Sequence, residues 1–223
     1  MTNANDQIKG AKLYGVSLSP FVRKVRAVLA LKGIDYELVN VMPGAMTAEF
    51  RAISPLAKVP VWEEEGFSLP DSSVICAYLD RRVPSPTAYP EDPQAFARDL
   101  FWEEYADTRL VEAASPVFFQ RIVRGKIFKE TPDENLLRRN EEELLPPVLD
   151  QLETLFVGRD GYDGSTCTVG GLGVWSACIN LSHAGYEIAT ADRPGLAAFV
   201  EKISAHPPLS AIVEEERAAL ANA

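Results

Sequence analysis

Four prolines between residues 84 and 93 divide this chain into two parts with different patterns. Proline lacks the backbone N–H that helices and central strands use, so this stretch indicates a linker. Before it, short apolar runs alternate with amphipathic helical runs, and after it apolar residues recur at helical spacing only. We therefore predict an α/β domain over residues 1–83, a linker over 84–93 and an all-helical domain over 94–223. With 223 residues, 47% of them hydrophobic, the chain is long enough for two small cores.

The first part has the order strand, helix, strand, helix, strand, strand, helix. Its clearest helix covers residues 20–32, where Val22, Val25 and Val28 recur at helical spacing and Gly33 is placed to end it. The remaining elements are predicted as strands at 11–14, 36–41, 59–63 and 67–69, and as helices at 46–53 and 71–82.

The second part is predicted to contain helices alone. Its apolar spacing is strongest over residues 172–181, 196–203 and 209–220. Pro146 and Pro147 lie inside one otherwise continuous helical run. We expect a kink or a restart there, because proline removes a helical hydrogen bond and clashes with the preceding turn.

Charge and composition exclude several classes of partner. The formal net charge of −10 would repel nucleic acid or an anionic membrane as the main partner. No apolar run approaches a membrane span, and residues 1–10 lack the apolar segment of a signal peptide. The three cysteines show neither disulfide nor metal-ligand spacing. These features predict a cytoplasmic protein with no metal, nucleic-acid partner or membrane partner.

Ser19 and Pro20 open the helix predicted over residues 20–32. Serine is a strong N-cap and proline is favoured in the first turn, so the free N–H groups and the positive end of the helix dipole lie beside Ser19. Such a position can hold a small anion. Ser19 could equally do no more than cap its own helix, and for this serine alone both interpretations stay open.

Four blocks, in order, resemble the glutathione transferase family, in a serine-type class similar to tau, theta or zeta. The first block has two pieces, and the blocks are Leu13–Gly15 with Ser19–Arg26, then Lys32–Glu37, Ser54–Pro60 and Leu69–Ser72. The resemblance extends over nearly the whole chain. It implies a thioredoxin-like first domain, an all-helical second domain, glutathione as co-substrate, a small hydrophobic electrophile as the other substrate, and a homodimer.

The resemblance gives Ser19 the role of hydrogen-bond donor to the glutathione thiolate. A free thiol with a pKa of about 8.5 is only a few per cent ionised at neutral pH. A helix terminus contributes about 0.3 to 1 kcal/mol and a hydroxyl bond to a charged partner about 1.5 to 3, which together lower that pKa by roughly one to three units. Ser17 and then Tyr14 are the rivals for this role.

The other blocks imply contacts along the tripeptide. Val59 and Pro60 resemble a cis Xaa-Pro turn that exposes the Val59 backbone to the cysteinyl unit as if to an added strand. Asp71 and Ser72 open a helix and match the ammonium and the carboxylate of the γ-glutamyl group. Lys58 is the cation for the glycyl carboxylate. Taken singly, Pro60 could be an edge-strand proline, Asp71 a plain cap and Lys58 a surface charge.

The electrophile is expected to meet side chains of the helical domain. Tyr105 and Arg109 are four residues apart, so they share a helix face and could bind a polar leaving group.

Two features depart from the family pattern. No Lys, Arg or His occurs from Val39 to Glu49, and Thr168 begins a capping box that Gly171 does not complete. These departures keep a second hypothesis open, a non-catalytic ligand carrier or scaffold of the same fold. A maleylacetoacetate isomerase is a weaker option, because its Ser-Ser-Cys signature is missing.

Overall fold

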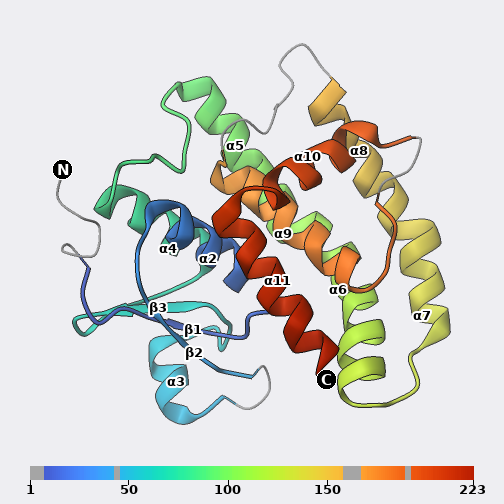
Figure 1. Cartoon of the computed structure of the whole chain (residues 1–223), viewed down its shortest axis with the longest axis horizontal. Coiled ribbons are helices and arrows are strands. Elements are labelled where there is room, and N and C mark those ends of the chain that lie inside the picture. Colours follow the sequence, from blue (N-terminus) through green and yellow to red (C-terminus); the bar gives the residue numbers. More distant parts are fainter. Residues whose placement is uncertain (1–7, 43–45, 158–166, 189–191) are drawn as a thin grey trace. The chain divides into compact units, whose positions relative to one another are not determined.

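The computed structural model describes residues 8–42, 46–157, 167–188 and 192–223 (Figure 1). The first seven residues of the chain's polar start lie outside this description. By its internal contacts the chain forms two compact units, Met1–Asp99 and Leu100–Ala223. The linker of residues 84–93 therefore groups with the first unit.

The first unit is built on a four-stranded mixed sheet in the order β2-β1-β3-β4. β1 pairs in parallel with β2, and the β1–β3 and β3–β4 pairs are antiparallel. A parallel pair needs a crossover connection, and the helix predicted over residues 20–32 supplies it. The strands are β1 (Lys12–Tyr14), β2 (Glu37–Val39), β3 (Val61–Glu64) and β4 (Phe67–Pro70). The predicted βαβ, α, ββα order of a thioredoxin-like domain is confirmed.

Helix α2 (Pro20–Lys32) has the predicted bounds because its two ends are specified locally. Ser19 caps its start, and Gly33 ends it with a left-handed φ of 65° that other residues rarely adopt. Its side chains at Val22, Val25 and Val28 are fully buried. The two remaining helices of this unit before the linker are α3 (Ala48–Ile53) and α4 (Ser72–Arg82).

The second unit is helical in every regular element that its described residues form, as predicted. Three of its segments wind as π-helix, which the periodicity did not reveal. One lies just ahead of Pro146, so the expected restart is a change from π to α winding at Leu145. After α5 (Pro93–Tyr105), which spans the boundary of the two units, come η1 (Ala106–Leu110), α6 (Val111–Phe118), η2 (Phe119–Ile127), α7 (Glu134–Arg138), η3 (Arg139–Leu144), α8 (Leu145–Val157), α9 (Val169–His183), α10 (Pro194–Ser204) and α11 (Pro207–Ala221).

Helix α9 forms the core of the second unit and packs against α6, η1 and α10. Every residue from Val169 to Leu181 is buried, as expected for a helix that is apolar on all sides. Polar bonds fasten neighbouring helices to it: Trp175 Nε1 donates to Ser204 Oγ of α10 at 2.9 Å, and His183 Nε2 lies 2.9 Å from Glu216 Oε2 of α11. Among the described residues, no helix is long and apolar enough to cross a membrane.

Candidate functional site

Gly15, at the end of β1, lies against two other segments of the first unit. A Cβ atom built on Gly15 would lie 2.4 Å from Val22 Cγ2 in the first turn of α2 and 3.4 Å from Val59 Cβ in the segment before β3. A side chain at residue 15 would therefore overlap α2. The glycine lets the first turn of α2 and the Val59 backbone approach the end of the strand, so these three segments meet at one place.

Ser19 caps α2 at this meeting point. Its Oγ accepts the Val22 N–H at 3.5 Å, and its own N–H donates to Val16 O at 3.0 Å. The side chain is half-buried. A capping bond of this length is weak and uses only an acceptor lone pair, so the hydroxyl proton can still be donated to another group. Ser19 thus combines a donor with the unsatisfied N–H groups of a helix start.

The Val59–Pro60 peptide bond is cis, which confirms the predicted turn. Pro60 is buried and Val59 is half-buried. The preceding residue, Lys58, is exposed, while its backbone is fixed by Ser54, whose Oγ accepts from Lys58 N at 3.1 Å and donates to Lys58 O at 2.7 Å. The turn therefore has a hydrogen-bonded backbone and an exposed cation beside it.

Asp71 joins the turn to α4. Its backbone N–H donates to Pro60 O at 3.3 Å, and its Oδ1 accepts the N–H groups of Ser73 and Val74 at 3.0 and 3.2 Å. Its φ of 82° and ψ of 129° are outside the regions that side-chain-bearing residues usually adopt. Such backbone strain costs about 1 to 3 kcal/mol and is concentrated at ligand sites and active sites. Asp71 is exposed, and Ser72 beside it is buried.

Lys24 was missed by the sequence reasoning, although its side chain is buried and links two helices of the site. Its Nζ donates to Ser73 Oγ at 3.1 Å, from α2 to the first turn of α4. The signal in the sequence was a helix with four cations and no acidic residue of its own; three of the cations, Arg23, Lys24 and Arg26, lie in its first half.

Tyr14, a rival for the donor role, directs its proton elsewhere. Its hydroxyl donates to Glu63 Oε2 at 3.1 Å. Burial, together with this bond and the charge of Glu63, raises the pKa of the Tyr14 phenol. The phenol therefore stays protonated and committed to a carboxylate. Ser17 is half-buried in the loop between Gly15 and Ser19.

Tyr105 and Arg109 lie in the second unit, where α5 gives way to η1. The Tyr105 hydroxyl donates to Val148 O of α8 at 3.3 Å, and burial raises the pKa of this phenol while Arg109 lowers it. Arg109 Nη1 lies 3.8 Å from Glu112 Oε2, and both side chains are largely exposed. Both residues thus have partners within the helical unit. The predicted residues that the structure brings together are those of the first unit, around Gly15, Pro60 and Asp71.

The chain is similar to known glutathione transferases in sequence and in fold. A family model described as glutathione S-transferase, N-terminal domain, matches residues 13–87. A protein of rice, Oryza sativa subsp. japonica, named probable glutathione S-transferase, is 29% identical over 92% of this chain and 89% of its own length. A glutathione S-transferase of Hyoscyamus muticus is 28% identical over 92% of this chain and 98% of its own.

Solved structures agree with this result. The crystal structure of a glutathione S-transferase from Methylobacterium radiotolerans, in complex with glutathione sulfonate, superposes with a TM-score of 0.72. It is 27% identical and the match covers 92% of this chain and 95% of the other.

Proposed function

We propose that this chain, which belongs to the glutathione transferase family, is a serine-type enzyme that ionises glutathione and transfers it to a small hydrophobic electrophile. The observation that carries the proposal is the joint of the cis Val59–Pro60 turn with Asp71 beside the start of α2. This joint presents a backbone edge, a carboxylate and two helix N-termini to one small region. A solved relative binds glutathione sulfonate, an acidic tripeptide that would need such groups.

The first unit supplies a partner for each part of glutathione. The N–H and C=O of Val59 pair with the extended cysteinyl unit. Asp71 binds the γ-glutamyl ammonium, since its capping bonds both end on Oδ1 and a carboxylate has further acceptor sites on its other oxygen. Ser72, which precedes the two N–H groups that Asp71 caps, binds the γ-glutamyl carboxylate at the start of α4, and exposed Lys58 binds the glycyl carboxylate.

Ser19 stabilises the thiolate. Its hydroxyl donates to the sulfur, and the N-terminus of α2 adds a smaller favourable term. The thiol proton leaves to solvent. The thiolate electron pair then forms a bond to an electrophilic carbon, and the leaving group departs with the electrons of the bond that breaks. Conjugation, peroxide reduction and cleavage of activated carbon–heteroatom bonds all begin from this anion. Tyr105 and Arg109 are the residues that we propose for the electrophile side.

Exposed apolar side chains and free cysteines bear on the oligomeric state and the cellular compartment of the enzyme. Leu56, Phe67 and Val74 of the first unit are large apolar side chains exposed by 69%, 47% and 48%, and we propose that a second copy of the chain covers them in a homodimer. The cysteines at 76, 167 and 178 are free thiols, which suits the reducing cytoplasm. Conjugation of apolar electrophiles makes detoxification the role that we propose.

The alternative of a non-catalytic carrier gains no support from the relatives, which carry enzyme names.

The proposal is tested by calorimetric titration with glutathione and by turnover of an activated aryl halide. Asp71→Asn should keep the unfolding midpoint, because asparagine caps helices about as well as aspartate. It should raise KM for glutathione by about tenfold or more, since a hydrogen bond to a charged group is worth about 1.5 to 3 kcal/mol.

Asp133→Asn is the matched control. Asp133 caps α7 with the same pattern of hydrogen bonds, its Oδ1 accepting the N–H groups of Asn135 and Leu136 at 3.1 and 3.0 Å, but its φ is −82° and it lies in the other unit. It should change neither quantity. Absence of saturable glutathione binding to the unaltered protein, or equal behaviour of the two variants, would refute the proposal.

A further inference from the structure

A basic and apolar segment of the second unit, residues 119–129, lies outside the proposed glutathione site. No acidic residue occurs between Glu112 and Glu130, although the chain as a whole has a net charge of −10. The segment, called here the basic tip, carries its cations at Arg121, Arg124, Lys126 and Lys129. The basic tip therefore has a positive formal charge, whereas the whole chain has a negative one.

The basic tip also exposes large apolar side chains. Phe119, Ile127 and Phe128 are exposed by 49%, 36% and 55%, while Phe118 and Ile122 are buried and anchor the segment to its unit. Scattered single apolar residues are normal on a surface, but three in one short segment that also carries four cations are a pattern typical of interfacial membrane helices.

The winding of η2 gathers these apolar residues on one side. Phe119 and Phe128 are nine residues apart, which in an α-helix is about two and a half turns and places them on opposite faces. The wider i→i+5 winding of a π-helix makes the same nine residues roughly two full turns. Phe128 directly follows η2 (Phe119–Ile127), so on this winding we expect its ring to share a face with the ring of Phe119.

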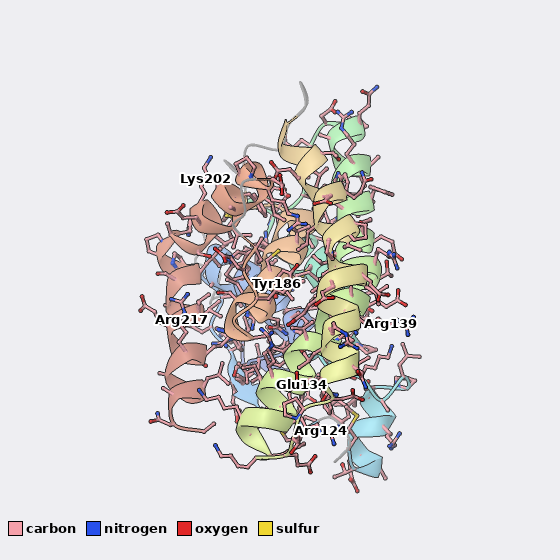
Figure 2. The ribbon with its side chains drawn as sticks, turned by 90° about the vertical axis from the view of Figure 1, so that its right-hand side faces the viewer. Arg124, Glu134, Arg139, Tyr186, Lys202 and Arg217 are labelled. Atoms are coloured by element: carbon pink, nitrogen blue, oxygen red, sulfur yellow. The ribbon has the colours of Figure 1, made fainter. Side chains whose placement is uncertain are left out.

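The basic tip lies at an end of the helical unit. In Figure 1 the light-green helix that continues from α6 ends at the lower edge of this unit, where the chain turns toward α7, and Figure 2 shows Arg124 at the same end. The Lys129 Nζ donates to Ala223 O at 2.8 Å, so the C-terminal residue lies there too.

Nearby acids neutralise the cations only in part. Arg121 pairs with Glu141 at 2.7 Å and Arg124 with Glu130 at 3.3 Å. Lys126 is exposed, with no ion pair or hydrogen bond among the described residues. The overall charge of −10 acts weakly at this end, because the Debye length is about 8 Å at physiological ionic strength. Charges at the tip therefore dominate its approach to a surface.

We propose that the basic tip binds reversibly to the surface of membranes that contain anionic lipids. Phe128, Ile127 and Phe119 would enter the boundary between headgroups and acyl chains, and the exposed Lys126 would lie among the anionic headgroups, since Lys129 already donates to Ala223 O. Reversible binding of this kind would concentrate a transferase where hydrophobic electrophiles dissolve. The sequence analysis predicted no membrane partner because the whole chain is acidic, and the proposal makes the basic tip an exception to that prediction.

The test is co-sedimentation of the full chain with vesicles of phosphatidylcholine alone and of phosphatidylcholine with phosphatidylserine. Binding should require phosphatidylserine and decline as salt is raised. Phe128→Ala should lower the partition coefficient about tenfold, and Lys126→Ala about fivefold at low salt. Both variants should keep the glutathione turnover and the unfolding midpoint of the unaltered protein.

Two exposed residues elsewhere are the controls: Met42→Ala, which removes an apolar side chain exposed by 47%, and Arg81→Ala, which removes a cation of α4. Neither should alter vesicle binding. The proposal is overturned if no vesicle binds at low salt, or if the control variants lose as much binding as the tip variants. It is also overturned if immobilised polyglutamate retains the protein while vesicles do not, since the tip would then fit an acidic protein partner.

Discussion

Gly15→Ala should disturb the glutathione site without touching any residue that contacts glutathione in our proposal. The added methyl group would lie 2.4 Å from Val22 Cγ2, well inside the sum of two carbon radii. The first turn of α2 must then move away from the cis turn at Val59, and Ser19 moves with it. We expect a higher KM for glutathione and a lower unfolding free energy.

Two terms set the size of the effect of Gly15→Ala: the contact with Val22, and the φ of 155° at residue 15, which residues with a side chain rarely adopt and which Val22→Ala does not relieve. Forcing one methyl group into a packed region costs about 1 to 3 kcal/mol. Val22→Ala by itself removes two buried carbons, at about 0.8 kcal/mol each plus a term for the remaining cavity, so about 2 kcal/mol is expected. In the double variant the Val22 atoms at 2.4 and 3.5 Å are gone, and the remaining one of the three nearest atoms, Val59 Cβ, lies at an ordinary contact distance of 3.4 Å.

The two substitutions should therefore compensate each other. The double variant should be more stable than the sum of the single effects predicts, by at least about 1 kcal/mol, and should recover part of the glutathione affinity. Urea unfolding of the unaltered protein, the two single variants and the double variant gives the coupling free energy. Initial rates at varied glutathione concentration give KM. Strictly additive losses would show that residues 15 and 22 do not compete for the same space, and the account of how the site is assembled would be wrong.

Three further outcomes are expected. Lys32→Met should lower the unfolding free energy by about 3 kcal/mol in urea, because the buried Nζ donates to Asp80 Oδ1, Val83 O and Pro86 O at 2.8, 2.7 and 2.7 Å; a loss below 1 kcal/mol would contradict this. Burial raises the pKa of Cys178 from 9.0 to about 12, so the folded state holds a proton that the unfolded state releases, and stability is lost as pH rises from 9 toward 12. Cys178→Ala should reduce this decline by up to about 1.4 kcal/mol per pH unit, and identical slopes would refute the argument. Tyr14→Phe should leave glutathione turnover within about twofold, since the phenol proton is committed to Glu63, and a loss of orders of magnitude would make Tyr14 the thiolate donor.

The fold was predictable where signals are local. Ser19 before a proline and Gly33, fourteen residues later, fix both ends of α2, and alternation around Gly66 fixes the β3–β4 hairpin. The π-helical segments were not predictable, because the apolar spacing of a few residues fits both windings and tertiary packing decides between them.

The site was predictable only in part. Residue types indicated the helix cap at Ser19, and the resemblance to the family implied the cis turn at Pro60. The conformation of Asp71, with φ of 82°, accompanies its bond to the Pro60 carbonyl, which no local pattern reveals. Burial of Lys24 and Lys32 was hidden for the same reason. Their partners Ser73 and Asp80 are 49 and 48 residues away in the sequence, so no local pattern connects them.

The most direct test of the central claim is the pKa of the glutathione thiol in its complex, measured by the ultraviolet absorbance of the thiolate as pH is varied. The unaltered protein should lower this pKa by roughly one to three units from the free value of about 8.5. Ser19→Ala should raise it again by roughly one to two units while glutathione stays bound, and Ser17→Ala should leave it unchanged. An equal thiol pKa in the Ser19→Ala variant and the unaltered protein would contradict the account.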